Sequence, residues 1–180
     1  MSDLIAQVRS MLASTPDRWA ALGRVDDAVL TAAPEPGEWS ALQALQHLVD
    51  TESGVFRVRV LAIRDGAESF PGFNPDAEGH VDHPEGSVAE LAAQLGPLRA
   101  ESLAILDTLT EADLGKTSRH TQLGVVTMAE LLNEWAAHDA MHLVQAERAA
   151  MQVFIPGSGP WRSYFVDHDV AAGPKQRGPH

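Results

Sequence analysis

The most chemically informative residues of this 180-residue sequence are His138 and His142, which stand four positions apart. In an α-helix this spacing rotates one side chain by about 40° relative to the other, so both imidazoles point the same way. The apolar pattern around them places the pair among core residues, where both rings must be neutral and have polar partners. One shared divalent cation satisfies that requirement. Two separate core histidines, bonded to backbone or carboxylate groups, are the alternative.

His47 is the natural third member of such a group. It lies early in a predicted helix, on the flank between the apolar stripe and the polar face. A side chain there reaches into the groove between neighbouring helices while it remains near solvent. A histidine on such a flank is more often a surface residue than a ligand, so position alone leaves both interpretations open.

Capping boxes predict where the helices that hold these histidines begin. The motif pairs a hydroxyl residue with Glu or Gln three positions later, and it occurs at Ser40, Ser87 and Thr127. Each is followed by apolar residues at helical spacing. Further upstream, the region around residues 4–12 predicts one helix, and Thr15-Pro16-Asp17 predicts the start of a second.

The remaining segments predict loops and a single domain. The stretch 33–38 is rich in turn residues, 66–86 is a longer loop, and 117–126 is the only plausible extended piece. The pattern favours an all-α four-helix bundle over residues 1–170, followed by a disordered tail at 171–180.

Composition limits the classes of partner. The formal net charge of −12 makes nucleic acid and membrane surfaces unfavourable partners, because both need a basic face. There is no cysteine, which excludes disulfides, thiolate metal sites and a cysteine nucleophile. No segment has the length of a membrane span or a signal core, so we expect a cytoplasmic protein.

A combination of short motifs resembles the DinB/YfiT-like family. These motifs are Glu38-Trp39-Ser40, the early-helix His47, and His138 and His142 followed by Gln145. The resemblance implies an up-up-down-down bundle, often a homodimer, in which His47, His138 and His142 bind a divalent metal. Family members with assigned activity are metal-dependent S-transferases and isomerases that use a low-molecular-weight thiol.

Three neutral imidazoles leave coordination positions for water or substrate, as in catalytic zinc sites. Such a metal lowers the pKa of bound water or of an incoming thiol, or polarises a carbonyl. Zinc or nickel is the expected ion. The predicted function is therefore a metal-dependent S-transferase that activates a small thiol, or water, for attack on a small-molecule electrophile. A non-catalytic metal-binding stress-response bundle is the alternative.

Three further residues are candidates for support of the metal ligands. Gln145 lies one turn beyond His142 and could orient it. Asp139 lies off the ligand face by about 60–100°, which favours a helix–helix hydrogen bond over a bond to an imidazole. Glu52 falls on an apolar stripe and needs a buried partner, for which Arg162 or the indole of Trp161 or Trp39 are candidates. We expect it to be a structural acid, with a general base as the alternative.

Two other features lie outside this pattern. The acidic segment 65–90 contains His80 and His83 beside carboxylates, which we interpret as solvated surface in preference to a second metal cluster. The aromatic segment Trp161–Phe165 follows the last helix and is expected to fold back over the bundle, or else to line the pocket or a dimer partner.

Overall fold

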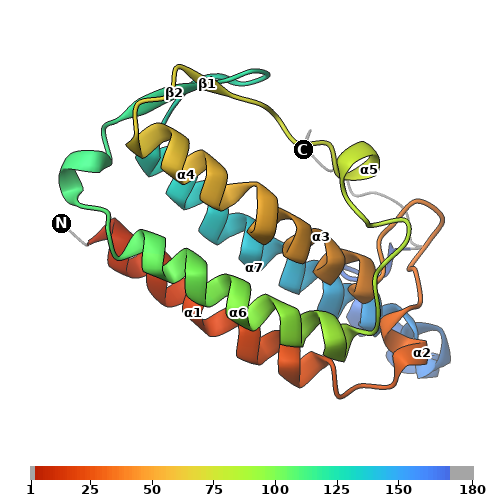
Figure 1. Ribbon diagram of the computed structural model, residues 1–180. Coiled ribbons are helices and arrows are strands. Elements are labelled where there is room, and N and C mark those ends of the chain that lie inside the picture. Colours follow the sequence, from red (N-terminus) through yellow and green to blue (C-terminus); the bar gives the residue numbers. More distant parts are fainter. Residues whose placement is uncertain (1–2, 171–180) are drawn as a thin grey trace.

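The computed structural model describes residues 3–170 and shows a bundle of long helices (Figure 1). The bundle helices are α1 (Leu4–Leu22), α3 (Ala41–Gly54), α4 (Phe56–Arg64), α6 (Val88–Leu106) and α7 (Met128–Gln152). Because α3 and α4 follow each other with only Val55 between them, they serve as one helix of the bundle. The predicted all-α four-helix bundle is confirmed, and the predicted tail at 171–180 lies outside the described residues.

The order of helix directions differs from the expected up-up-down-down arrangement. One apolar cluster joins the end of α1 to the starts of α3 and α6 and to the later turns of α7. A second cluster joins the start of α1 to α4, the end of α6 and the first turns of α7. Along the chain the helices therefore run up, down, down, up. The cause is the connection after α4, which crosses back along the whole bundle before α6 begins (Figure 1).

The helix starts follow the predicted caps. At Ser40, Ser87 and Thr127 the side chain accepts a hydrogen bond from the amide three residues on, and the Gln or Glu there bonds back to the cap amide. Each cap thus satisfies orphan amides of the first turn and determines where its helix begins.

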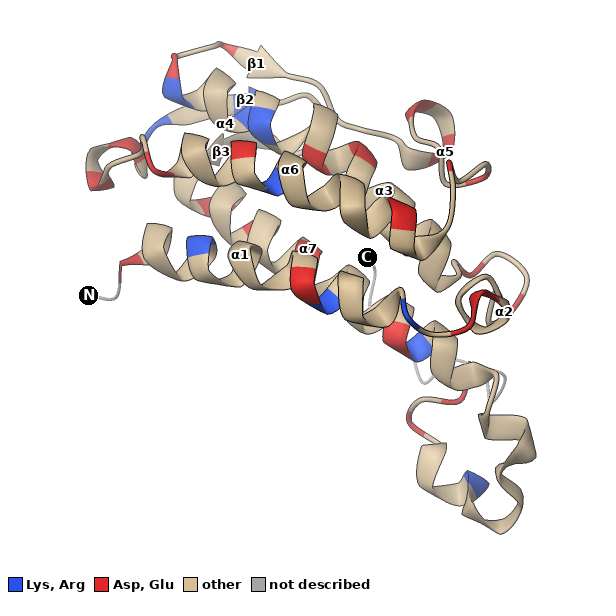
Figure 2. Ribbon diagram, turned by 60° about the horizontal axis from the view of Figure 1, so that its bottom comes forward, with Lys and Arg blue, Asp and Glu red and all other residues tan. Residues whose placement is uncertain are grey.

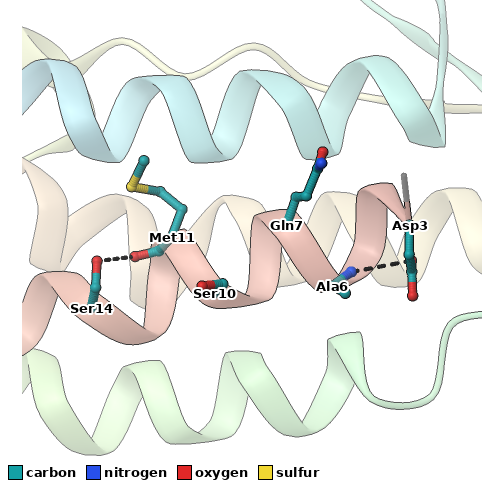
Figure 3. A pocket seen from close by; sticks show the side chains of 6 residues that line it. All are labelled: Asp3, Ala6, Gln7, Ser10, Met11 and Ser14. Atoms are coloured by element: carbon teal, nitrogen blue, oxygen red, sulfur yellow. Dashed lines mark hydrogen bonds between the residues drawn. The ribbon is translucent and has the colours of Figure 1, made fainter. Parts of the chain in front are cut away.

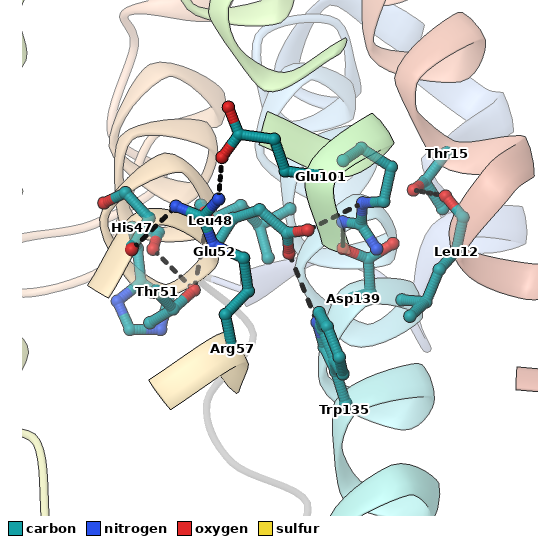
Figure 4. Close-up of polar contacts among 12 residues, drawn as sticks. Leu12, Thr15, His47, Leu48, Thr51, Glu52, Arg57, Glu101, Trp135 and Asp139 are labelled. Atoms are coloured by element: carbon teal, nitrogen blue, oxygen red, sulfur yellow. Dashed lines mark hydrogen bonds and ion pairs between the residues drawn. The ribbon is translucent and has the colours of Figure 1, made fainter. Parts of the chain in front are cut away.

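The N-terminal region forms one helix, and the predicted second start at Thr15 is wrong. Pro16 lies inside α1, where its ring nitrogen cannot donate to the carbonyl of Leu12. The Thr15 hydroxyl donates to that carbonyl instead, at 3.1 Å (Figure 4). Since Thr15 is fully buried, packing keeps the helix continuous across the proline.

Short elements fill the connections. They are α2 (Asp27–Leu30), α5 (Pro75–Glu78), the 3-10 helices η1 (Glu111–Asp113) and η2 (Ile155–Phe165), and the strands β1 (Ser69–Phe70), β2 (Thr117–His120) and β3 (Gly124–Thr127). The predicted extended piece forms the antiparallel β2–β3 hairpin, in which Thr117 pairs with Thr127. β1 adds a parallel strand that the sequence does not predict, since two residues are too few to show an alternation.

The aromatic segment after α7 does not fold back over the bundle. Trp161 is 64% exposed and Tyr164 is 78% exposed, and the chain projects from the end of the bundle (Figure 2). Only Ile155 of η2 is buried. Two prolines and two glycines precede the aromatic residues, and the positive φ of Gly159 turns the chain before they can reach the core.

No helix among residues 3–170 is both long and apolar enough to cross a bilayer.

The acidic segment 65–90 keeps its carboxylates on the surface. Figure 2 shows carboxylate residues on α5 and beside it, with no basic residue among them.

A layer of buried polar side chains separates the two apolar clusters. Arg99 of α6 lies at its centre, with Nη2 at 2.5 Å from Asp139 Oδ1 of α7 and Nε at 3.2 Å from Glu52 Oε1 of α3. All three side chains are at most 2% exposed. The indole of Trp135 donates to the second oxygen of Glu52 at 3.2 Å (Figure 4). One guanidinium thus joins three helices through two buried carboxylates.

Replacing Arg99 by Ala is expected to lower the free energy of unfolding by about 3–5 kcal/mol, because it leaves two carboxylates buried without a counter-charge. Urea denaturation measures the loss. The variant that combines Arg99→Met with Glu52→Gln and Asp139→Asn should regain most of it, since no buried charge is then unpaired.

The control is Arg9→Ala, which breaks the exposed ion pair of Arg9 with Asp107. It should cost less than about 1 kcal/mol. Equal losses for Arg9→Ala and Arg99→Ala would contradict the central role of Arg99.

Candidate metal centre

Three histidine side chains converge between α3 and α7. His47 Nε2 lies 3.0 Å from His138 Nε2, and His142 Nε2 lies 3.2 Å from the same atom. His47 comes from the second turn of α3, and the other two come from successive turns of α7. The structure therefore brings together the three residues that the resemblance implies as ligands.

The hydrogen-bond pattern around His142 fixes which of its nitrogens is free. Its Nδ1 lies 2.8 Å from Gln145 Oε1, which can only accept, so Nδ1 carries the proton and Nε2 presents a lone pair. Gln145 thus orients His142, as the sequence predicts.

A cation fits the three converging nitrogens better than hydrogen bonds do. His138 Nε2 faces both His142 and His47, and a single N–H on that atom can point along only one of these two contacts. At one of the two contacts, an Nε2 lone pair therefore faces a nitrogen that donates no hydrogen bond to it. A divalent ion accepts all three lone pairs, and imidazole nitrogen is among its preferred ligands.

Burial keeps the imidazoles neutral and therefore competent as ligands. The pKa of His47 falls from 6.5 to about 4, chiefly because burial disfavours the charged ring and secondarily through repulsion from His142. The pKa of His138 falls to about 2 for the same leading reason, with His142 and His47 adding repulsion. Burial also lowers the pKa of His142, against a smaller opposing effect of its bond to Gln145.

Aromatic rings enclose the cluster. Trp39, the residue before the Ser40 cap, lies 5.1 Å from the ring of His47 and stacks at 5.9 Å on His142. Phe56 meets His138 edge-on at 5.1 Å, and Phe73 lies 6.1 Å from His47. Among the described residues no hydrogen-bond partner reaches Nδ1 of His47 or His138. Ring packing, in contrast to the hydrogen bond at His142, therefore holds these two imidazoles.

The two candidate carboxylates lie in the buried ionic layer, where no described hydrogen bond joins them to a histidine ring. Asp139 makes the predicted helix–helix interaction, through Arg99. Glu52 pairs with Arg99 and Trp135, so the predicted partners Arg162, Trp161 and Trp39 are wrong. Arg162 lies on η2 and pairs there with Asp169. Burial raises the pKa of Glu52, and Arg99 opposes that rise.

The loop histidines do not join a second cluster. His80 bonds through its amide and Nδ1 to Asp50 of α3, and this bond raises the pKa of its exposed ring. Within residues 3–170, the group of His, Asp and Glu side chains with metal-ligand spacing is His47, His138 and His142. Phe56 and Phe73 could not be assigned to this site from sequence, because each reaches it through a tertiary contact without a spacing signal.

One pocket reaches the cluster. It has a volume of about 610 Å³ and lies between the loop before α3 and the later turns of α7, where Trp39, His142, Gln145 and Arg148 contribute to its wall. Another, of about 560 Å³, lies on α1 between Asp3 and Ser14 (Figure 3). There the Asp3 carboxylate accepts from the amide of Ala6, and the Ser14 hydroxyl donates to the carbonyl of Met11. The α1 pocket contains no histidine, whereas the pocket beside Trp39 and Gln145 includes His142 in its wall.

Comparison with known proteins agrees with this architecture. YfiT from Bacillus subtilis, described as a probable metal-dependent hydrolase with an unusual four-helix bundle topology, is similar in structure with a TM-score of 0.72. The match covers 85% of this chain and 89% of that chain at 16% sequence identity, so the likeness concerns the fold. No curated protein matches at a significant level. The family model of the DinB superfamily matches residues 11–146, and the chain belongs to that superfamily.

Proposed function

We propose that the protein is a divalent-metal enzyme in which His47, His138 and His142 hold the ion and leave positions open for a nucleophile. The observation that supports this most directly is the convergence of the Nε2 atoms of three imidazoles in one partly buried cluster. Zinc or nickel is the proposed ion, since both bind imidazole well.

The protein's own residues would prepare the site in three ways. Gln145 holds His142 with its Nε2 lone pair toward the cluster. Trp39, Phe56 and Phe73 pack against the ligand rings and restrict their rotation. When bound, a divalent ion with open coordination positions lowers the pKa of a coordinated water or thiol.

The nucleophile is proposed to be water or a small thiol. Hydrolysis is favoured by the likeness to YfiT, which is described as a probable metal-dependent hydrolase. The histidine and Trp-Ser motifs resemble those of the DinB/YfiT-like family, and that resemblance implies S-transfer. Because the chain has no cysteine, any thiol in the reaction must come from outside the protein.

A non-catalytic metal-binding bundle is the alternative. In that case the ion would join α3 to α7, and its binding energy would be folding energy. A chelator should then lower the melting temperature markedly. If the protein is an enzyme, the chelator should lower the melting temperature only slightly, because the ionic layer and the apolar clusters stabilise the fold without the ion. The expected homodimer stays a prediction in either case.

Protein purified without a nickel column should bind about one zinc or nickel per chain, measured by elemental analysis and titration calorimetry. His142→Ala should lower the affinity by more than about a hundredfold, because loss of a ligand costs more than the 10–100-fold expected for loss of its hydrogen-bond partner. His83→Ala, at an exposed histidine outside the cluster, is the control and should leave affinity unchanged. A stoichiometry near zero would overturn the proposal.

Visible spectroscopy of the cobalt(II)-loaded protein separates the enzyme from the alternative. β-Mercaptoethanol or azide should shift the absorption bands, because a ligand that enters an open position changes the cobalt coordination. If neither additive changes the spectrum, no coordination position of the cobalt is accessible, and the catalytic proposal would fail.

Stability without metal should fall as the pH falls from about 6.5 toward 4. The pKa values of the buried histidines are lower in the folded state, so the unfolded state binds more protons in this range. Their contribution is fully present above about pH 6.5 and decreases by up to about 1.4 kcal/mol per pH unit for each histidine.

Urea denaturation with a chelator at several pH values measures this dependence. His138→Leu should flatten the slope relative to the unmodified protein, whereas His83→Ala should not. Parallel slopes for all three proteins would contradict burial of a neutral His138.

A further inference from the structure

The pocket beside His142 has the size and composition of a small-ligand site. Its volume of about 610 Å³ falls within the range of about 300–1,000 Å³ that is usual for such sites. Pro34 and Trp39 form one wall, and Met141, Val144 and Ala149 of α7 form the other. Met141 and Val144 are 50% and 60% exposed, so apolar side chains face an open space there.

Three polar residues follow one another along α7 in this pocket. His142, Gln145 and Arg148 are spaced three apart, and each contributes to the wall. At a rise of about 1.5 Å per residue, Arg148 lies about 9 Å along the helix axis from His142. The pocket is therefore lined both by a ring of the histidine cluster and by a guanidinium.

Arg148 is held in place but has free donors. Its Nε donates to the carbonyl of His168 at 3.2 Å, and the Gln152 side chain donates to the carbonyls of both Arg148 and His168. Within residues 3–170, none of the ion pairs includes Arg148. Its Nη groups can therefore bind an acceptor, and the planar fork of a guanidinium matches a carboxylate.

We propose that this pocket binds a small molecule with an apolar body and a carboxylate, and that Arg148 binds the carboxylate. The proposal rests on the proposed function and adds the substrate class to it. The apolar body would lie between Trp39 and α7, and the carboxylate would lie beside Arg148, about 9 Å along the helix axis from His142. Glu38 also contributes to the wall, so the test of the proposal includes a cationic probe.

Calorimetric or NMR titration with hexanoate, hexanamide and hexylamine tests this, with zinc-loaded protein and with chelator-treated protein. The three probes share an apolar chain and differ in charge. Hexanoate should bind about 10–100-fold more tightly than hexanamide, the range expected for charge-assisted hydrogen bonds. Arg148→Gln should reduce that ratio to near one, and Arg148→Lys should keep part of it.

Arg24→Gln, at an exposed arginine outside the pocket, is the matched control and should keep the full ratio. A ratio that survives Arg148→Gln would overturn the proposal, as would tightest binding of hexylamine, because the pocket would then prefer a cation. Hexanoate binding that requires zinc and ignores Arg148→Gln would also overturn it, because the carboxylate would then be a metal ligand.

The chelator arm separates this failure from failure of the proposed function. If the protein bound no metal and still selected hexanoate through Arg148, the carboxylate site would be supported and the proposed metal enzyme would be contradicted. If the protein bound metal and showed no charge preference, the metal site would be supported and the carboxylate site would be contradicted.

Discussion

The placement of the histidines depends on the pairing of Arg99 with Glu52 and Asp139. These charges are almost fully buried, so each helix must keep the position that gives its charge a partner. Glu52 lies just over one turn from His47 on α3, and Asp139 is the neighbour of His138 on α7. A shift of either helix that separated the imidazoles would therefore also break a buried ion pair.

This constraint has a cost in stability. Between the two apolar clusters, the polar layer replaces hydrophobic packing with groups that must all be partnered. Oδ2 of Asp139 has no hydrogen-bond partner among the described residues. The layer holds one guanidinium and two carboxylates, an arrangement that carries excess negative charge when both acids are ionised. Such a layer suits a neighbouring cation site.

The sequence predicts the local parts of this site better than its tertiary parts. The caps at Ser40, Ser87 and Thr127 and the bond from His142 to Gln145 involve residues within one turn, so spacing alone reveals them. Arg99 is different. It is nearly 50 residues from Glu52 and 40 from Asp139, and an arginine in an apolar helix pattern gives no sign of which acids it will meet. The up-up-down-down order comes from the family resemblance and not from a helix pattern, and it is wrong because the long connection after α4 crosses back along the bundle (Figure 1).

Trp39 connects the cap at the start of α3 with the histidine cluster and the pocket. Its neighbour Ser40 caps α3, so the cap that starts the helix also fixes the backbone from which the indole extends. That indole then lies against His47 of the same helix and stacks on His142 of α7, and it forms part of the wall that faces Arg148. The ring therefore belongs to both the histidine cluster and the pocket. A ligand held by Arg148 would lie against the same indole that restricts the imidazoles, so substrate binding and metal geometry would share one rigid contact.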